Sequence, residues 1–208
     1  MLRLKDRVAI ITGGSQGIGA AYVREFVAEG ARVVIADVVP ADKLIKTVEG
    51  LGSEPMFVET DITDEAAVQN LVEKTLERFG GVDVLVNNAA LWVHVPAKPI
   101  LEIEKTEWDQ ILDVNINGTF LCTKAVVPHM QKRGYGKIIN ISSGRALKGQ
   151  TNLLHYDTSK GAVISFTRSI ARELGVDGIR ANTIAPGGVM TDAVLAQDNV
   201  RTHIAMGT

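Results

Sequence analysis

Apolar and polar positions divide this chain into short apolar runs and longer segments with helical periodicity, which alternate from one end to the other. The short runs are rich in Val and Ile and predict strands at residues 7–12, 32–36, 56–60, 82–87, 137–142 and 180–185. The longer segments predict helices at residues 17–29, 41–51, 64–79, 105–132 and 156–174. Strands that are apolar throughout are buried on both faces, so the pattern predicts an α/β fold, a doubly wound parallel sheet between two helical layers.

Composition and charge narrow the class of protein. A chain of 208 residues with 46% hydrophobic and 22% charged residues is ordinary for a folded protein, and we expect residues 1–208 to form a single domain. The net charge of −2, without a basic cluster, argues against nucleic-acid binding. No apolar run reaches the ~18 residues of a membrane span, and the first residues do not resemble a signal peptide, so we expect a cytoplasmic protein. The single cysteine, Cys122, excludes an internal disulfide and is expected to pack inside a helix.

Polar and glycine-rich motifs follow the predicted strands directly. In a doubly wound sheet, ligands bind at the carboxyl ends of the strands, so we expect these motifs to converge at one edge. They are the loop at residues 12–19, Asp37, Asp61, the pair Asn87 and Asn88, the pair Ser142 and Ser143, and the pair Pro186 and Gly187.

The loop at residues 12–19 reads Thr-Gly-Gly-Ser-Gln-Gly-Ile-Gly and joins the first strand to the first helix. Its glycines, Gly13, Gly17 and Gly19, permit a tight turn and a close approach of a pyrophosphate to the helix N-terminus, although their spacing is wider than G-x-G-x-x-G. Asp37 ends the second strand eighteen residues after Gly19, a spacing typical of the acid that binds a cofactor ribose. Because a carboxylate repels a 2′-phosphate and no basic residue follows it, these residues favour NAD over NADP. The alternative is that Asp37 only caps the next turn.

The sequence Tyr156-Asp-Thr-Ser-Lys160 opens a predicted helix, and Ser143 lies thirteen positions upstream, after a predicted strand. Residues four apart share one face of a helix, so the Lys160 ammonium would lie beside the Tyr156 phenol. A free phenol has a pKa near ~10, and nearby positive charge favours the phenolate. These residues predict that Tyr156 acts as a general acid or base, while Ser143 hydrogen-bonds the same substrate oxygen.

Taken together, these motifs resemble the single-domain branch of the short-chain dehydrogenase/reductase family, which has a Rossmann fold. The matching stretches follow the family's order over nearly the whole chain: TGGSQGIG, Asp61-Ile62, NNAA at residues 87–90, Asn115 within DVNINGTF, NISS at residues 140–143, YDTSK, and PGGVMT at residues 186–191. Two positions depart from the family pattern without removing a reacting group, Ala90 in place of glycine and Thr158 in place of alanine.

The sequence ends at Thr208, before the lid and the seventh strand that the family usually carries. A fragment, an incomplete sequence and an unusually short protein are the alternatives. If the natural chain ends there, we expect one edge of the sheet to be exposed.

The resemblance implies a role for each matching residue. Asn115, Ser143, Tyr156 and Lys160 would form a catalytic tetrad, in which Asn115 holds a water that links Lys160 to solvent. The residues implied to bind the cofactor are Gly13, Ser15, Gln16, Gly17, Ile18, Gly19, Asp37, Asp61, Ile62, Asn88, Ala89, Ala90, Tyr156, Lys160, Pro186, Gly187, Val189 and Thr191. Candidate substrate-facing residues are Trp92, His94, Gly144, Arg145, Leu153 and Gly188, a mostly apolar wall that suggests a hydrophobic or cyclic secondary alcohol.

The resulting hypothesis is an NAD-dependent oxidoreductase that interconverts a secondary alcohol and a ketone. We expect a homodimer or homotetramer paired through the helices at residues 105–132 and 156–174, and no metal site, because the histidines, cysteine and carboxylates lack ligand spacing. His155 is expected on the surface or behind the pocket rather than lining it. The alternatives are an NADPH-dependent carbonyl reductase and a truncated or scaffold protein that binds cofactor without turnover.

Overall fold

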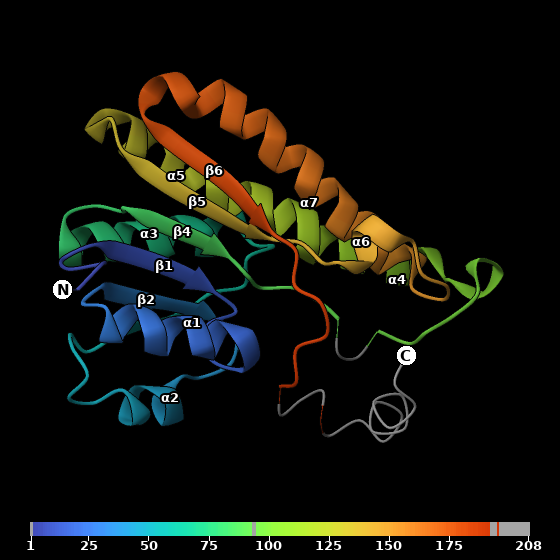
Figure 1. The fold of residues 1–208 in the computed structure, drawn as a ribbon, viewed down its shortest axis with the longest axis horizontal. Coiled ribbons are helices and arrows are strands. Elements are labelled where there is room, and N and C mark those ends of the chain that lie inside the picture. The colour runs from blue at the N-terminus through green and yellow to red at the C-terminus, as the bar shows by residue number, and fades with distance from the viewer. Residues whose placement is uncertain (1, 93–94, 192–194, 196–208) are drawn as a thin grey trace.

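The computed structural model describes residues 2–92, 95–191 and 195 (Figure 1). These residues form a parallel six-stranded sheet in the order β3-β2-β1-β4-β5-β6, with β3 and β6 at its edges. The direction of strand addition reverses between β1 and β4, which is where doubly wound folds bind their ligands. The strands are β1 (Val8–Thr12), β2 (Arg32–Asp37), β3 (Met56–Glu59), β4 (Val84–Asn87), β5 (Gly136–Ile141) and β6 (Ile179–Ile184).

Helices cover both faces of the sheet, as the strand–helix alternation predicts (Figure 1). α1 (Gly17–Ala28) and α2 (Asp42–Thr47) pack on one face, and α3 (Glu65–Phe79), α5 (Thr119–Arg133) and α7 (Leu154–Glu173) cover the other. The shorter α4 (Lys105–Leu112) and α6 (Arg145–Lys148) pack against α7. None of the helices in the described part of the chain has the length and apolar character needed to span a membrane.

The six predicted strands are confirmed to within two residues at each end, but the helix predicted at residues 105–132 is not continuous. It divides into α4, the π-helical segment η2 (Asp113–Gly118) and α5. Asn and Gly are poor helix residues, and η2 contains both. A Cβ at Gly118 would lie 2.5 Å from Ile62 Cδ1, so the chain packs closer there than any other residue allows. The helix predicted at residues 41–51 is shorter in the structure, where only α2 is helical. Three further helices of the described residues, α6, η1 (Ile100–Glu102) and η3 (Leu174–Asp177), were not predicted because they are too short to give a periodic signal.

Alternation of side chains along each strand builds a separate core on each face of the sheet. In β1, Ala9 and Ile11 pack with α1 and α2, whereas Ile10 packs with α3 and α5. Both β1 and β4 are buried along their whole length, which is why they read as continuous apolar runs. Cys122 lies inside α5, as predicted, in the core that the sheet forms with α3 and α5. Burial raises the pKa of its thiol to about 12.

Amide side chains join the strands to the helices near the carboxyl end of the sheet. Asn87 and Asn140 are register partners on β4 and β5, and Asn87 Nδ2 donates to Asn140 Oδ1 at 2.8 Å. Asn87 Nδ2 also donates to Thr123 Oγ1 on α5 at 3.1 Å, and Asn140 Nδ2 donates to Thr167 Oγ1 on α7 at 2.9 Å. Because unpaired buried polar groups are costly, these bonds fix how α5 and α7 sit on the sheet.

A buried carboxylate holds the opposite end of the sheet together. Asp83, just before β4, accepts hydrogen bonds from the Val8 N–H at 2.9 Å, from Arg7 Nη1 at 3.3 Å and from Arg133 Nη2 at 3.1 Å. The side chain of Asp83 is 3% exposed, so these partners replace nearly all of its water. The Asp83 carboxylate therefore joins the start of β1, the start of β4 and the end of α5.

We expect Asp83→Asn to lower the free energy of unfolding by about 1.5–3 kcal/mol, because it removes hydrogen bonds made to a buried charge. Urea denaturation followed by circular dichroism measures the change. The control is Asp109→Asn, which breaks the exposed Lys105–Asp109 pair within α4 and should cost no more than about 0.5 kcal/mol. Equal losses in the two variants would contradict the role given to Asp83.

Candidate active site

The glycine loop leads from β1 into α1 at the carboxyl edge of the sheet. Gly13 and Gly17 adopt left-handed backbone conformations, with φ of +62° and +56°, and a Cβ at Gly19 would lie 2.0 Å from the Gly13 carbonyl oxygen. Within the described part of the chain no side chain caps the N-terminus of α1, and its first turn contains no acidic residue. The first N–H groups and the positive end of the helix dipole, beside Ser15, Gln16 and Ile18, suit an anion such as a pyrophosphate.

The NNAA segment after β4 is tied to this loop. The Thr12 hydroxyl accepts from the N–H groups of Asn88 and Ala89 at 3.0 and 3.1 Å, and Asn88 Nδ2 donates to the carbonyls of Thr12 and Gly13, both at 3.0 Å. A Cβ at Gly13 would lie 2.8 Å from Ala89 Cα, so the two segments are in direct contact. Ala90 follows as an exposed residue.

Asp37 faces the glycine loop from the end of β2. Its Oδ2 accepts from the Ser15 N–H at 2.9 Å and its Oδ1 from the Val39 N–H at 3.0 Å. The Ser15 hydroxyl closes the same turn by donating to the Val39 carbonyl at 2.6 Å. Asp37 does cap this turn, and each carboxylate oxygen retains a second acceptor position that a ribose hydroxyl can use.

Asp61 and Ile62, predicted to contact the adenine, have further local functions. Asp61 Oδ1 accepts from the N–H and the hydroxyl of Thr63 at 2.9 and 2.7 Å, which closes the turn before α3. Ile62 is buried beneath Gly118, so its side chain supports η2.

The segment that follows β6 returns to the glycine loop. The Gly144 N–H donates to the Pro186 carbonyl at 2.8 Å, and a Cβ at Gly17 would lie 3.7 Å from Thr191 Cγ2. Val189, between these two contacts, is exposed. The structure thus brings Thr191 to the start of α1 and Pro186 to Gly144, and the chain between these two contacts carries the predicted residues Gly187, Gly188 and Val189.

Tyr156 and Lys160 are buried on α7 beside the end of β5. Lys160 Nζ donates to the Ile141 carbonyl at 2.9 Å and lies 5.9 Å from the centre of the Tyr156 ring. Burial lowers the pKa of Lys160 to about 8. Burial also raises the pKa of Tyr156 above its ordinary value, and hydrogen bonding with Ser143 opposes this effect. The phenol is therefore protonated at neutral pH in the protein alone.

The end of β5 presents two serines to α7. The Ser142 hydroxyl donates to the Lys160 carbonyl at 2.7 Å, which adds to the Lys160–Ile141 bond. The Ser143 oxygen accepts from the Arg145 N–H at 3.2 Å, which leaves its O–H to act as a donor. Ser143 thus combines an oxygen held by the backbone with an O–H that can donate, next to the phenol.

Asn115 is fully buried in η2 and joins three segments. Its Oδ1 accepts from the Leu91 N–H at 2.8 Å, and its Nδ2 donates to the Leu91 carbonyl at 3.3 Å and to Ser159 Oγ at 3.0 Å. Its backbone carbonyl accepts from the Thr119 hydroxyl at 2.9 Å and has a second acceptor position. The Asn115 side chain therefore joins Leu91, which directly follows the NNAA segment, to Ser159 on α7. The water expected at Asn115 stays a prediction, and the second acceptor position of the carbonyl is where it would bind.

Trp92 stands beside the phenol. The ring centres of Trp92 and Tyr156 are 5.5 Å apart, with the planes tilted by 42°. Gly144 lies at the start of α6 and Leu153 at the start of α7. Arg145 differs from the prediction, because its guanidinium binds Asp157. His94 lies outside the described residues.

His155 is fully buried, so the expectation of a surface position is wrong, whereas a position behind the pocket agrees with the structure. Its Nδ1 accepts from the Tyr156 N–H at 3.0 Å. The reason is tertiary: the start of α7 is enclosed by the packing of the elements around it, α4 among those that contact this helix, and the sequence around His155 carries no sign of these neighbours.

Two site residues, Ser159 and Asp157, were missed by sequence reasoning although both lie inside YDTSK. The Ser159 hydroxyl accepts from Asn115 and donates to the Tyr156 carbonyl at 2.7 Å. Asp157 accepts from Arg145. The one available signal was their polar character next to Tyr156 and Lys160, and it did not identify their partners.

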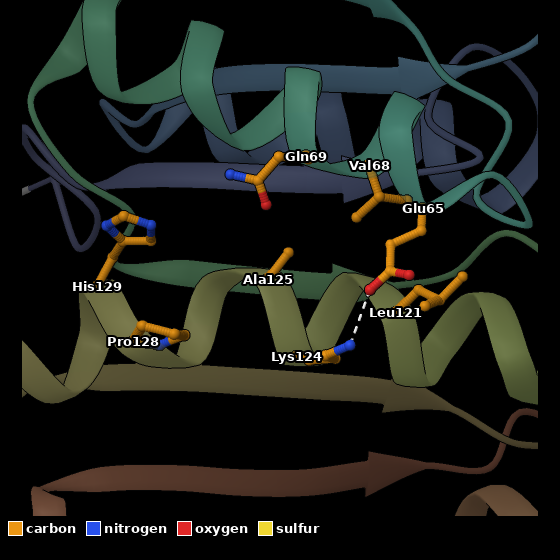
Figure 2. Close-up of a pocket in the computed structure, with 8 residues that line it drawn as sticks. All are labelled: Glu65, Val68, Gln69, Leu121, Lys124, Ala125, Pro128 and His129. Carbon is orange, nitrogen blue, oxygen red and sulfur yellow. Dashed lines mark hydrogen bonds and ion pairs between the residues drawn. The ribbon is translucent and has the colours of Figure 1, made fainter.

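A separate groove of about 320 Å³ lies between α3 and α5 (Figure 2). Figure 2 shows Glu65 and Lys124, joined by an ion pair at 2.7 Å, at one end of the groove and His129 at the other. Its remaining lining residues are Val68, Gln69, Leu121, Ala125 and Pro128. No residue predicted for the cofactor or the substrate lines it, so the groove is distinct from the candidate active site.

Comparison with known proteins agrees with this arrangement. The profile of the family described as "short chain dehydrogenase" matches residues 7–201. A 3-alpha-(or 20-beta)-hydroxysteroid dehydrogenase of Mycobacterium tuberculosis is 42% identical over 189 residues, which cover 91% of this chain and 71% of that protein. A cis-4-hydroxycyclohexanecarboxylate dehydrogenase of Sinomonas cyclohexanicum is 38% identical over 190 residues, which cover 91% and 76%. The crystal structure of levodione reductase matches with a TM-score of 0.90 at 33% identity, over 96% of this chain and 81% of that chain. This chain therefore belongs to the short-chain dehydrogenase/reductase family of oxidoreductases, which act on alcohols and ketones.

Proposed function

We propose that the protein is an NAD-dependent oxidoreductase that interconverts a cyclic secondary alcohol and its ketone within a single domain. The observation that carries the proposal is the cluster of Ser143, Tyr156 and Lys160 at the end of β5. The segment after β6 links this cluster to the glycine loop through its contacts at Gly144 and Gly17.

The chain's own residues fit a dinucleotide. Gly13, Gly17 and Gly19 form a turn that other residues would obstruct, and the N-terminus of α1 faces it. Asp37 offers one acceptor position on each oxygen to a ribose, and its charge disfavours a 2′-phosphate. When bound, the nicotinamide supplies the hydride acceptor or donor.

The protein's part in the reaction is proton transfer and placement. In ketone reduction, the Ser143 O–H and the Tyr156 phenol donate to the substrate oxygen, and the phenol proton is transferred as the alcohol forms. In alcohol oxidation, Tyr156 takes that proton back as a phenolate. Since burial raises the pKa of Tyr156, reduction is favoured near neutral pH, and oxidation requires added positive charge or alkaline pH. Lys160 supplies such a charge when it is protonated.

The substrate is proposed to be a compact cyclic alcohol or ketone. Trp92 places an aromatic wall beside the phenol, and flat apolar walls bind rings through area and shape. The printed names of two similar proteins, a hydroxysteroid dehydrogenase and a hydroxycyclohexanecarboxylate dehydrogenase, support the same class.

We also propose a homo-oligomer that associates through α5 and α7. Phe120 on α5 leaves 47% of its surface exposed and would supply apolar area to this contact.

Tyr156→Phe should lower kcat by roughly 10²–10⁴-fold, the usual contribution of a general acid or base, with NADH affinity close to that of the wild type. Absorbance assays with a panel of cyclohexanols and cyclohexanones, beside NADH titration by fluorescence, give the two quantities. Tyr135→Phe, whose ring contacts Arg7 and Lys137, is the matched control and should retain turnover. Full activity in Tyr156→Phe would refute the proton-transfer role.

Asp37→Asn should weaken NADH binding by roughly tenfold or more and narrow the preference over NADPH, because a charged acceptor for ribose hydroxyls is lost. Asparagine retains an acceptor for a loop N–H, so the turn is preserved better than by alanine. Dissociation constants for both cofactors measure the ratio, and Asp42→Asn in the first turn of α2 controls for a general change in charge. An unchanged ratio in Asp37→Asn would show that Asp37 does not select the cofactor.

Lys160→Met should gain stability relative to the wild-type, cofactor-free protein as pH falls to 7, by up to about 3 kcal/mol across the titration, while turnover is lost. The lost bond to the Ile141 carbonyl lowers the stability of the variant equally at every pH. The folded protein releases the Lys160 proton near pH 8, whereas the ordinary value is 10.5, so between these values the unfolded chain binds more protons. Wild-type stability therefore falls as pH drops from 10.5 to 8, and the advantage of the variant shrinks as pH rises through this window. Urea denaturation at several pH values, with the exposed Lys124→Met as control, tests the effect. A difference that does not vary with pH would contradict it.

A further inference from the structure

The two proposed substrate-binding hydroxyls are carried by separate elements. Ser143 follows β5, and Tyr156 lies in the first turns of α7, thirteen residues later. The intervening residues form α6 and an exposed turn with few buried apolar groups. The Lys160–Ile141 and Ser142–Lys160 bonds join α7 to β5 behind this segment, but the segment itself needs a further contact to keep its two ends in a defined relation.

An ion pair closes this segment. Arg145 Nε donates to Asp157 Oδ1 at 2.9 Å, and Arg145 Nη2 donates to Asp157 Oδ2 at 3.3 Å. The side chains of Arg145 and Asp157 are 24% and 11% exposed, so the pair is shielded more than an ordinary surface ion pair. Two donors of one guanidinium therefore meet both oxygens of one carboxylate, the arrangement that best fixes relative orientation.

Further bonds connect the same pair to the turn between α6 and α7. Asp157 Oδ2 also accepts from the Gln150 N–H at 3.3 Å. The Arg145 guanidinium also donates to the Gln150 side-chain oxygen and to the Thr151 carbonyl, the latter at 3.4 Å. The backbone at Gln150 and Thr151 is thus bound to these two charged side chains.

The pair also touches each catalytic segment through the chain itself. The Arg145 N–H donates to Ser143 Oγ at 3.2 Å, so the backbone of Arg145 fixes the oxygen whose proton would point to substrate. Asp157 is the neighbour of Tyr156 on α7. A shift of Arg145 relative to Asp157 would therefore change the distance between the Ser143 hydroxyl and the Tyr156 phenol.

We propose that Arg145 and Asp157 are positioning residues that hold the Ser143 hydroxyl in register with the Tyr156 phenol. The inference rests on the proposed function of these two groups. It also accounts for Arg145, because four of the five N–H donors of its guanidinium are engaged by Asp157, Gln150 and Thr151, so the side chain supports the substrate site rather than binding the substrate.

The test combines kinetics with a double-mutant cycle. Arg145→Gln and Asp157→Asn should each lower kcat by roughly ten- to a hundredfold, the scale expected for a small displacement of reacting groups, with the NADH dissociation constant unchanged. The double variant should be no worse than the poorer single variant, because the two residues act as one unit. The Glu65→Gln and Lys124→Gln cycle, on the ion pair of the α3–α5 groove, is the matched control and should leave kcat unchanged.

Amide hydrogen exchange of the cofactor-free protein separates this inference from the proposed function. Residues 144–153 should exchange faster in both single variants, with α1 and α3 unaffected, and this readout needs no turnover. A protein without activity on any alcohol or ketone would refute the proposed function while exchange still reports on the pair. Unchanged exchange in residues 144–153, losses of kcat that multiply in the double variant, or a loss that appears as weaker NADH binding would each overturn the positioning role.

Discussion

The hydrogen bond from Lys160 Nζ to the Ile141 carbonyl is the contact on which the rest of the candidate site depends. Together with the bond from the Ser142 hydroxyl to the Lys160 carbonyl, it fastens α7 to the end of β5. Tyr156 lies one helical turn before Lys160, and Ser143 lies two residues after Ile141. The phenol and the serine hydroxyl therefore meet because this junction is made, and the site inherits its geometry from the packing of one helix on one strand.

That junction places an amine where water is largely excluded, so stability and function oppose each other there. Burial lowers the pKa of Lys160 and raises that of Tyr156, which means that the protein alone disfavours the charged forms of both groups. Near this junction, the buried amide of Asn115 has hydrogen-bond partners in the Leu91 backbone and the Ser159 hydroxyl. Asn115 lies in the π-helical segment η2, which also contains Gly118 in close contact with Ile62. The regular α-helical hydrogen-bond pattern is therefore interrupted next to the candidate site.

Much of the fold could be predicted because its signals are local. Apolar runs located all six strands, and the glycine loop and Asp37 were recognisable from their place after β1 and β2. The unbroken helix predicted at residues 105–132 was wrong, because Asp113–Gly118, which contains the poor helix residues Asn and Gly, forms a π-helical segment that interrupts it. Burial of His155 could not be predicted, because it follows from the packing of elements remote in sequence, such as α4, against α7.

The sequence by itself determined the succession of strands and helices along the chain and the chemical groups at the strand ends, because backbone propensity and motif spacing act over a few residues. Tertiary structure alone decided which of those groups touch. The bonds from Asn115 to Leu91 and Ser159 join residues 24 and 44 positions apart, and Arg145 turns toward Asp157 across the turn between α6 and α7. Such pairings follow from how whole elements pack, because a hydrogen bond forms only where packing brings donor and acceptor within reach and buries both.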